Sequence, residues 1–180
     1  MHTVLLTILA PAWAQTSPAH APVVIDRVEV VVGTRVITAS DLRLSIALDS
    51  RDPSPVPVLQ GAAPDPLQRL IDRTILRGLA GQVRVYQPDE ADVRARVDAL
   101  RSSWSSLSDY QRFLRSHGLD EERLQRRMKE RMLVERYIRR NLAAPAQGER
   151  RVGLAQYIEW MAGLRASVRV RRIRAGADEL

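Results

Sequence analysis

The chain has no cysteine, only one phenylalanine and only three histidines. Without cysteine it cannot form disulfides, use a thiol nucleophile or carry a lipoprotein anchor. His2, His20 and His117 are far apart and lack partners at metal-ligand spacing, so we expect no metal site. No glycine-rich loop follows a predicted strand, and the serines of residues 102–106 have no neighbouring histidine. We therefore expect neither catalysis nor a bound cofactor.

Positive charge is carried almost entirely by arginine. Of the 28 basic residues only Lys129 is a lysine, and the formal net charge is +7. The excess lies toward the end of the sequence, where residues 151–174 contain six arginines and one acid, Glu159. Such a segment could contact nucleic acid, anionic lipid or acidic polypeptide. The alternative is a solvated surface in a chain encoded by GC-rich DNA.

The first residues resemble an export signal. Residues 4–10 are apolar, and Ala12-Trp13-Ala14 has the small-x-small pattern that signal peptidase accepts. The apolar run is shorter than the roughly 20 residues that span a bilayer, so we expect no stable membrane insertion. We predict a signal peptide at residues 1–14, cleaved after Ala14, then a flexible lead-in at 15–22 and a periplasmic location. Two points stay open: a buried or disordered tail, and a true start codon upstream, because Met1-His2-Thr3 contains no Lys or Arg.

Strand patterns occur at both ends of the chain. In residues 23–32 one side of the predicted strand is lined by valines, namely Val24, Val28, Val30 and Val32. Gly33 suits a tight turn, so Val36-Ile37 can fold back as a hairpin. A lone hairpin is marginal in water, and Val168 and Val170, alternating with arginines, would supply a third strand. We therefore expect the two ends of the chain to meet in one small sheet.

The residues between these ends are predicted to be helical. Thr38 and Asp41 have capping-box spacing for a first helix that ends near Ser50. Further helices are expected at about 65–82, from Pro88 onward, and at 108–117, 120–142 and 152–166. The inward faces are predicted to include Ile46, Leu79, Leu154, Ile158, Met161 and Leu164. The fold class is thus mainly α: a six-helix core plus an N-terminal hairpin joined by a C-terminal strand.

Three further predictions concern a loop and individual charged side chains. Residues 51–64 contain four prolines, which excludes regular structure and indicates an exposed loop. Arg131 and Glu135 lie four residues apart within an apolar stripe, and we expect an exposed ion pair, with a buried pair as the alternative. His117, just before Gly118, is interpreted as a cation near a helix C-terminus.

These segments, in this order, resemble the SurA-type periplasmic chaperones. The similarity lies in residues 24–33 and 36–42, in 70–76, in 108–142 with Gly118-Leu119-Asp120 between two helices, and in Trp160, Leu164 to Ala166 and Val168. The resemblance implies one chaperone core domain over residues 23–174, followed by a disordered tail at 175–180. Long members of that family carry parvulin isomerase domains before the closing helix. Residues 143–150 are too few for such a domain, so we expect no isomerase activity.

The resemblance implies a holdase for unfolded polypeptides, with nascent outer-membrane proteins as partners. We expect an apolar groove lined by adaptable side chains, and the candidate peptide-binding residues are Met128, Met132, Trp160 and Met161, with a core role as the alternative. A second hypothesis is an interaction subunit that binds one folded partner, such as a component of an assembly machine. Nucleic-acid binding is a third hypothesis, and the export signal disfavours it.

Overall fold

The computed structural model describes residues 26–61, 65–142 and 153–173. It confirms a mainly helical fold with a small three-stranded antiparallel sheet. The predicted signal peptide with Ala14, the lead-in, the linker at 143–150 and the tail at 175–180 lie outside the described residues. The elements in chain order are β1 (Val28–Val32), β2 (Arg35–Thr38), α1 (Ala39–Arg51), α2 (Val58–Gly61), α3 (Pro66–Ala80), the 3-10 helix η1 (Arg84–Tyr86), α4 (Glu90–Ser102), α5 (Leu107–Ser116), α6 (Glu121–Leu142), α7 (Leu154–Ala166) and β3 (Val170–Arg172).

The sheet joins the two ends of the described chain, as predicted. Its strand order is β2-β1-β3, with Val31 opposite Val36 and Val32 opposite Val170. Gly33 makes the hairpin turn at φ +59°, a left-handed conformation that glycine adopts without steric cost. The inner face of the sheet packs on α3 through Val30, Val32, Ile37, Ile71 and Ile75. The sheet is therefore held by one helix of the core.

The start of α1 is fixed by the predicted capping box. The Thr38 hydroxyl accepts a hydrogen bond from the Asp41 backbone N–H at 3.2 Å, and the Asp41 carboxylate accepts one from the Thr38 backbone N–H. These bonds satisfy two donors that the helix itself cannot. The hairpin thus leads directly into the helical part of the molecule.

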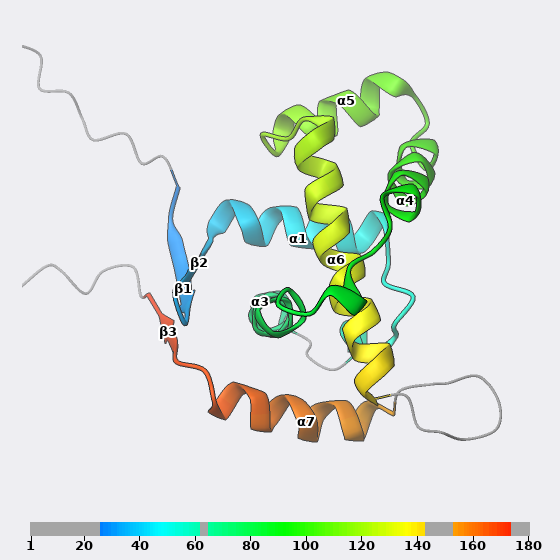
Figure 1. Ribbon diagram of the computed structural model, residues 1–180. Coiled ribbons are helices and arrows are strands. Elements are labelled where there is room, and N and C mark those ends of the chain that lie inside the picture. The colour runs from blue at the N-terminus through cyan, green and yellow to red at the C-terminus, as the bar shows by residue number, and fades with distance from the viewer. Residues whose placement is uncertain (1–25, 62–64, 143–152, 174–180) are drawn as a thin grey trace, which may run out of the picture.

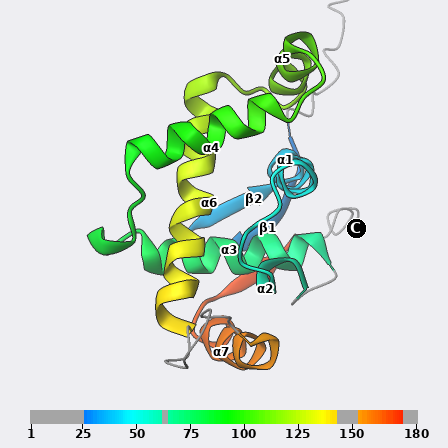
Figure 2. The ribbon, with the colours of Figure 1, turned by 90° about the vertical axis from the view of Figure 1, so that its right-hand side faces the viewer.

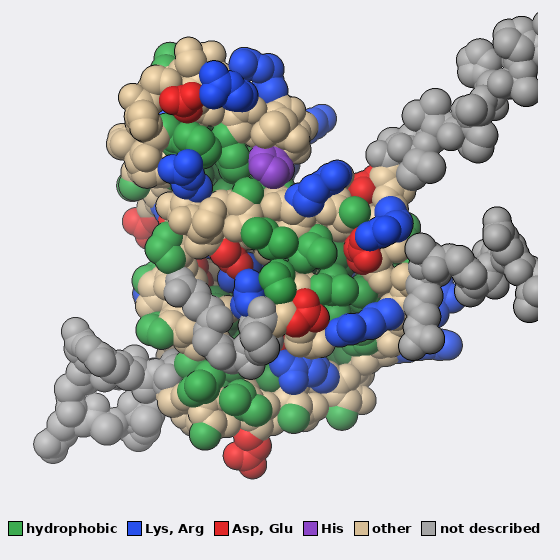
Figure 3. Space-filling view, turned by 180° about the vertical axis from the view of Figure 1, so that it is seen from behind, with side chains coloured by type: hydrophobic (Ala, Val, Ile, Leu, Met, Phe, Trp, Pro, Cys, Tyr) green, Lys and Arg blue, Asp and Glu red, His purple; other side chains and the backbone are tan. Residues whose placement is uncertain are grey.

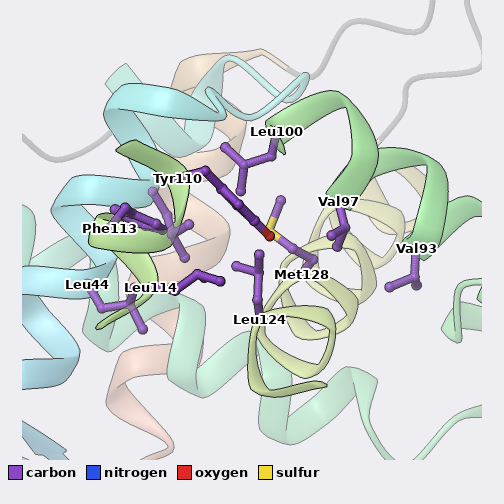
Figure 4. Packing of buried hydrophobic residues seen from close by; sticks show 10 residues of the cluster. Leu44, Val93, Val97, Leu100, Tyr110, Phe113, Leu114, Leu124 and Met128 are labelled. Carbon is purple, nitrogen blue, oxygen red and sulfur yellow. The ribbon is translucent and has the colours of Figure 1, made fainter. Parts of the chain in front are cut away.

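Helix α6 runs through the middle of the molecule, with α4 and α5 near one end and α7 near the other (Figures 1 and 2). Near its start, Leu124 and Met128 join a cluster of buried residues from α1, α4 and α5. Figure 4 shows both side chains pointing toward Tyr110 of α5. Toward its end, Val134, Ile138 and Leu142 join a second cluster with α3 and α7. Helix α6 thus contributes to both hydrophobic clusters.

Helix α7 is attached to α3 by a buried ion pair. The Arg165 guanidinium donates two hydrogen bonds to Asp72, from Nε at 2.8 Å and from Nη2 at 2.5 Å. Tyr157 and Met161 are the buried residues of α7. The prediction that Leu154 and Ile158 point inward was wrong, because both are 45% exposed, and Ile46 and Leu79 are exposed as well.

The proline-rich segment was predicted as an exposed loop, and this is wrong for the part that the structure describes. Ser54, Val56, Val58 and Leu59 are buried, and α2 lies within the segment. Val56, Val58 and Leu59 pack in the second cluster with α6 and α7. The prolines exclude a long helix, but they leave the apolar side chains between them free to turn inward.

Candidate functional site

The structure does not bring the four predicted peptide-binding residues to one surface. Met128 and Met161 are both 0% exposed and belong to different hydrophobic clusters. Met132 is partly buried against the first cluster, and Trp160 is partly buried against the second. The Trp160 ring lies 5.7 Å from the ring of Tyr137, centre to centre. Met128 and Met132 thus belong to the first cluster, whereas Trp160 and Met161 belong to the second.

A hollow lies instead between β2, α1, α3 and α6. It has a volume of about 230 Å³. Figure 3 shows apolar side chains gathered in the middle of this side of the molecule, with basic and acidic side chains around them. The apolar lining comes from five elements and consists of Val36, Ile37, Leu44, Leu48, Leu59, Leu70 and Val134. We call this hollow the central pocket.

Charged side chains form the rim of the central pocket. Arg77 of α3 donates a hydrogen bond to Glu130 of α6 at 2.7 Å, and Arg127 of α6 donates one to Asp41 of α1 at 2.8 Å. These pairs tie the three helices together around the opening. Because Arg77, Arg127 and Glu130 are partly exposed, each pair contributes little to stability and remains able to exchange partners.

A buried ion network lies behind the rim. Asp49 of α1 accepts hydrogen bonds from Arg73 at 3.0 Å and from Arg131 at 2.9 Å. Glu135 is bound by Arg96 of α4, with the two closest atoms 2.5 Å apart. The prediction of an exposed pair between Arg131 and Glu135 is wrong, since both are largely buried and each bonds to other helices. The network fixes α1, α3, α4 and α6 relative to one another.

Two arginines that line the central pocket have an Nε atom without a hydrogen-bond partner. Among the described residues, the buried Nε atoms of Arg77 and Arg131 have no hydrogen-bond acceptor, and both arginines line the central pocket. The Nε atom of Arg131 lies 3.6 Å from a carboxylate oxygen of Asp52, which is beyond hydrogen-bond distance. Buried donors are nearly always paired in proteins. Both Nε atoms are shielded from solvent, so they lie within the walls of the pocket and are not exposed to its interior.

A second hollow, more polar and about 410 Å³ in volume, lies between the start of α1 and the start of α6. His117 lines it, and burial together with the positive charge of Arg43 lowers the pKa of this imidazole. A pKa below 6.5 leaves the side chain neutral at pH 7, so the prediction that His117 is a helix-end cation is not supported. The ring packs on Phe113, with the ring centres 4.9 Å apart.

Sequence reasoning missed the central pocket. One signal was present, because Arg73 and Arg77 lie one helical turn apart, as do Arg127 and Arg131. Such spacing shows that two arginines share a helix face, but it does not show that the two faces meet. That information comes only from the packing of α3 on α6.

Comparison of the chain with models of protein families, with curated proteins and with solved structures found no significant match. The resemblance to SurA-type chaperones thus rests on the residues quoted above and stays a prediction. None of the helices in residues 26–61, 65–142 and 153–173 combines the length and apolar character needed to cross a bilayer.

Proposed function

We propose that the chain is an exported, chaperone-like domain that binds unfolded or partly folded polypeptides in the periplasm, with outer-membrane proteins as its clients and without isomerase activity. The observation that carries the proposal is the central pocket, with its aliphatic lining and charged rim. An apolar interior binds apolar side chains without requiring one particular sequence, and the charged rim keeps the surface around the opening hydrated.

The size of the pocket favours a peptide side chain over a cofactor or a drug-sized molecule. Pockets for such ligands usually measure about 300–1,000 Å³. A cavity of about 150 Å³ is enough to hold benzene. At about 230 Å³, the central pocket suits one large side chain or two small ones. Holding one short stretch of chain at a time is what a holdase requires.

The four predicted peptide-binding residues differ in whether a client could reach them. Met132 and Trp160 are partly buried, so each retains some surface that a client could contact. Met128 and Met161 have no exposed surface, and contact with a client would require the core to open. We therefore place the first contact with the client at the central pocket, which neither Met132 nor Trp160 lines.

Light scattering by a denatured outer-membrane porin tests the proposal. The porin is diluted from urea with and without stoichiometric protein. We expect the wild type to suppress aggregation and Leu70→Asp to lose this effect, because the new carboxylate would lie on the apolar lining of the pocket. Leu107→Asp is the matched control, since Leu107 is exposed on α5 and does not line the pocket.

Circular dichroism and thermal unfolding must show that both variants are folded. Equal activity of Leu70→Asp and the control would place client binding elsewhere. If the wild type suppresses no aggregation and instead forms a complex with one folded partner, the function is that of an assembly subunit.

A further inference from the structure

The three-stranded sheet exposes one of its two faces. Val30 and Val32 point to the inner face, which packs on α3. Side chains alternate along a strand, so Val31 points the opposite way. Val31 lies opposite Val36 in β2 and opposite Arg171 in β3, which places these three side chains in one row across the sheet. We call the side of the sheet that carries this row the outer face.

The outer face carries apolar side chains where a solvated sheet face normally carries polar ones. Val36 is 52% exposed, and Val31 is partly exposed. Ile173 donates a backbone hydrogen bond to the Glu29 carbonyl, continues the alternation of β3 on the outer side and is 38% exposed. The centre of the outer face is therefore aliphatic.

Exposed arginines surround this aliphatic centre. Arg171 belongs to the row across the sheet, Arg169 lies beside the hairpin turn, and Arg35 begins β2. Within residues 26–61, 65–142 and 153–173, no carboxylate forms an ion pair with any of the three. Glu29, the acid of β1, is already paired with Arg27 at 2.6 Å. The outer face thus has a surplus of positive charge.

The size of the outer face argues against a folded protein as its partner. A stable protein interface has roughly 20–30 residues on each side. The three strands contain 5, 4 and 3 residues, and only alternate residues point outward. A second copy of the chain would, in addition, bring identical arginines together.

The chemistry of the outer face favours lipid over nucleic acid. Proteins that bind single-stranded nucleic acid stack its bases on aromatic side chains, whereas Val31, Val36 and Ile173 are aliphatic. A guanidinium group binds phosphate oxygens in a bidentate manner. Aliphatic side chains beside such groups enter the boundary between headgroups and acyl chains. A bilayer with anionic headgroups matches both kinds of side chain.

We propose that the outer face of the sheet docks reversibly on an anionic membrane surface, with Arg169 and Arg171 at lipid phosphates and with Val36 and Ile173 at the boundary of the acyl chains. This docking gives a role to the arginine-rich end of the sequence, which the proposed function leaves unused. It is separate from client binding in the central pocket, because neither Arg169 nor Arg171 lines that pocket.

Co-sedimentation with lipid vesicles tests the proposal on the full chain. One preparation contains only phosphatidylcholine, and the other contains phosphatidylglycerol as well. We expect the wild type to bind the anionic vesicles but not the neutral ones. Binding should weaken as the salt concentration rises, because salt screens exposed charges. Inorganic phosphate at the concentration of the lipid phosphate should not release the protein.

A pair of charge-matched variants assigns the binding to the outer face. Arg169→Gln with Arg171→Gln should weaken binding to the anionic vesicles by roughly thirtyfold, the combined effect expected of two arginines near such a surface. Arg139→Gln with Arg140→Gln is the control, since these exposed arginines lie at the end of α6 away from the sheet (Figure 1). All proteins carry the same residues 1–25, so a difference between the two variants comes from the substituted arginines.

A second pair of variants tests the apolar part of the outer face. Val36→Thr keeps the branched shape that suits a strand and replaces a methyl group by a hydroxyl. It should weaken vesicle binding several-fold, whereas Leu107→Thr, on the exposed side of α5, should not. Circular dichroism must show that the variants are folded. If one is not, the dependence of wild-type binding on headgroup and salt decides the question.

The membrane proposal is overturned if neutral vesicles bind equally well, if the Arg169 and Arg171 double variant binds like its control, or if inorganic phosphate releases the protein. Binding of a single-stranded oligonucleotide without binding of vesicles would overturn it too. The same double variant should suppress porin aggregation as the wild type does. Failure of vesicle binding therefore leaves the proposed function intact, and failure of porin suppression leaves the membrane proposal intact.

Discussion

The change Glu135→Gln tests the buried network that supports the central pocket. Glu135 is only 4% exposed and accepts hydrogen bonds from Arg96 at 2.5 and 3.0 Å and from the Ser54 hydroxyl at 2.9 Å. Burial by itself lowers the pKa of Arg96, but hydrogen bonds to Glu135 and Asp52 raise it overall. A guanidinium does not lose its proton in proteins, so Arg96 stays charged in the variant. Breaking a buried pair usually costs about 3–5 kcal/mol.

We expect a loss at the low end, about 3 kcal/mol in the free energy of unfolding, because Arg96 keeps its contact with Asp52 at 2.8 Å. Urea denaturation followed by circular dichroism measures it. The control is Glu122→Gln on the same helix, whose side chain is 83% exposed and pairs with Arg126. An exposed pair contributes little, so the control should lose no more than about 0.5 kcal/mol.

A double variant, Arg96→Met with Glu135→Leu, shows whether the loss of stability comes from an unpaired buried charge or from poorer packing. Replacing both partners by apolar groups removes the two charges of the pair together, and Asp52 keeps an ion pair with Arg131 at 3.6 Å, so the double variant should be more stable than Glu135→Gln. If Glu135→Gln loses as little stability as Glu122→Gln, the network does not hold the helices and the reasoning is refuted.

Three further predictions concern stability. Met128→Ala should lower the free energy of unfolding, measured by urea denaturation, by about 3 kcal/mol, because the side chain is fully buried. Met132→Ala should lower it clearly less. Equal losses would contradict the placement of Met128 in the core. Thr38→Ala removes the cap of α1 and should lower the free energy of unfolding by about 1 kcal/mol, whereas Thr38→Ser should retain most of it. The lowered pKa of His117 means that the unfolded chain binds a proton first as the pH falls through about 6.5, so stability should decrease from pH 7 to pH 5.5, and His117→Gln should reduce that decrease.

The sheet was predictable because its signals are local. Alternating valines mark β1, Gly33 marks the turn, and Thr38 with Asp41 marks the start of α1. The pairing of the two ends followed from the need to complete a marginal hairpin. These features depend on neighbouring residues or on one simple physical requirement.

The inward face of α7 was not predictable in the same way. Apolar residues occur on all sides of this helix, so a periodicity of 3.6 residues does not select one face. The structure buries Tyr157 and Met161 against α3, α6 and the proline-rich segment, and it leaves Leu154 and Ile158 exposed. The choice depends on partners that are distant in the sequence.

The candidate site was out of reach of sequence reasoning for the same reason. Each wall of the central pocket is an ordinary amphipathic element, and the hollow exists only where β2, α1, α3 and α6 meet. The methionines were predicted as adaptable contacts for a peptide, yet Met128 and Met161 are buried in the core. Exposure, which decides whether a side chain can bind a client, is a property of the assembled helices.

The pairing of β3 with β1 has a consequence for biogenesis. Val32 and Val170 are neighbours in the sheet although roughly 140 residues separate them along the chain. Such a distant contact forms slowly, and during synthesis β1 must wait until the residues of β3 have been made. The chain therefore passes through an open intermediate in which one side of β1 stays unpaired until β3 arrives.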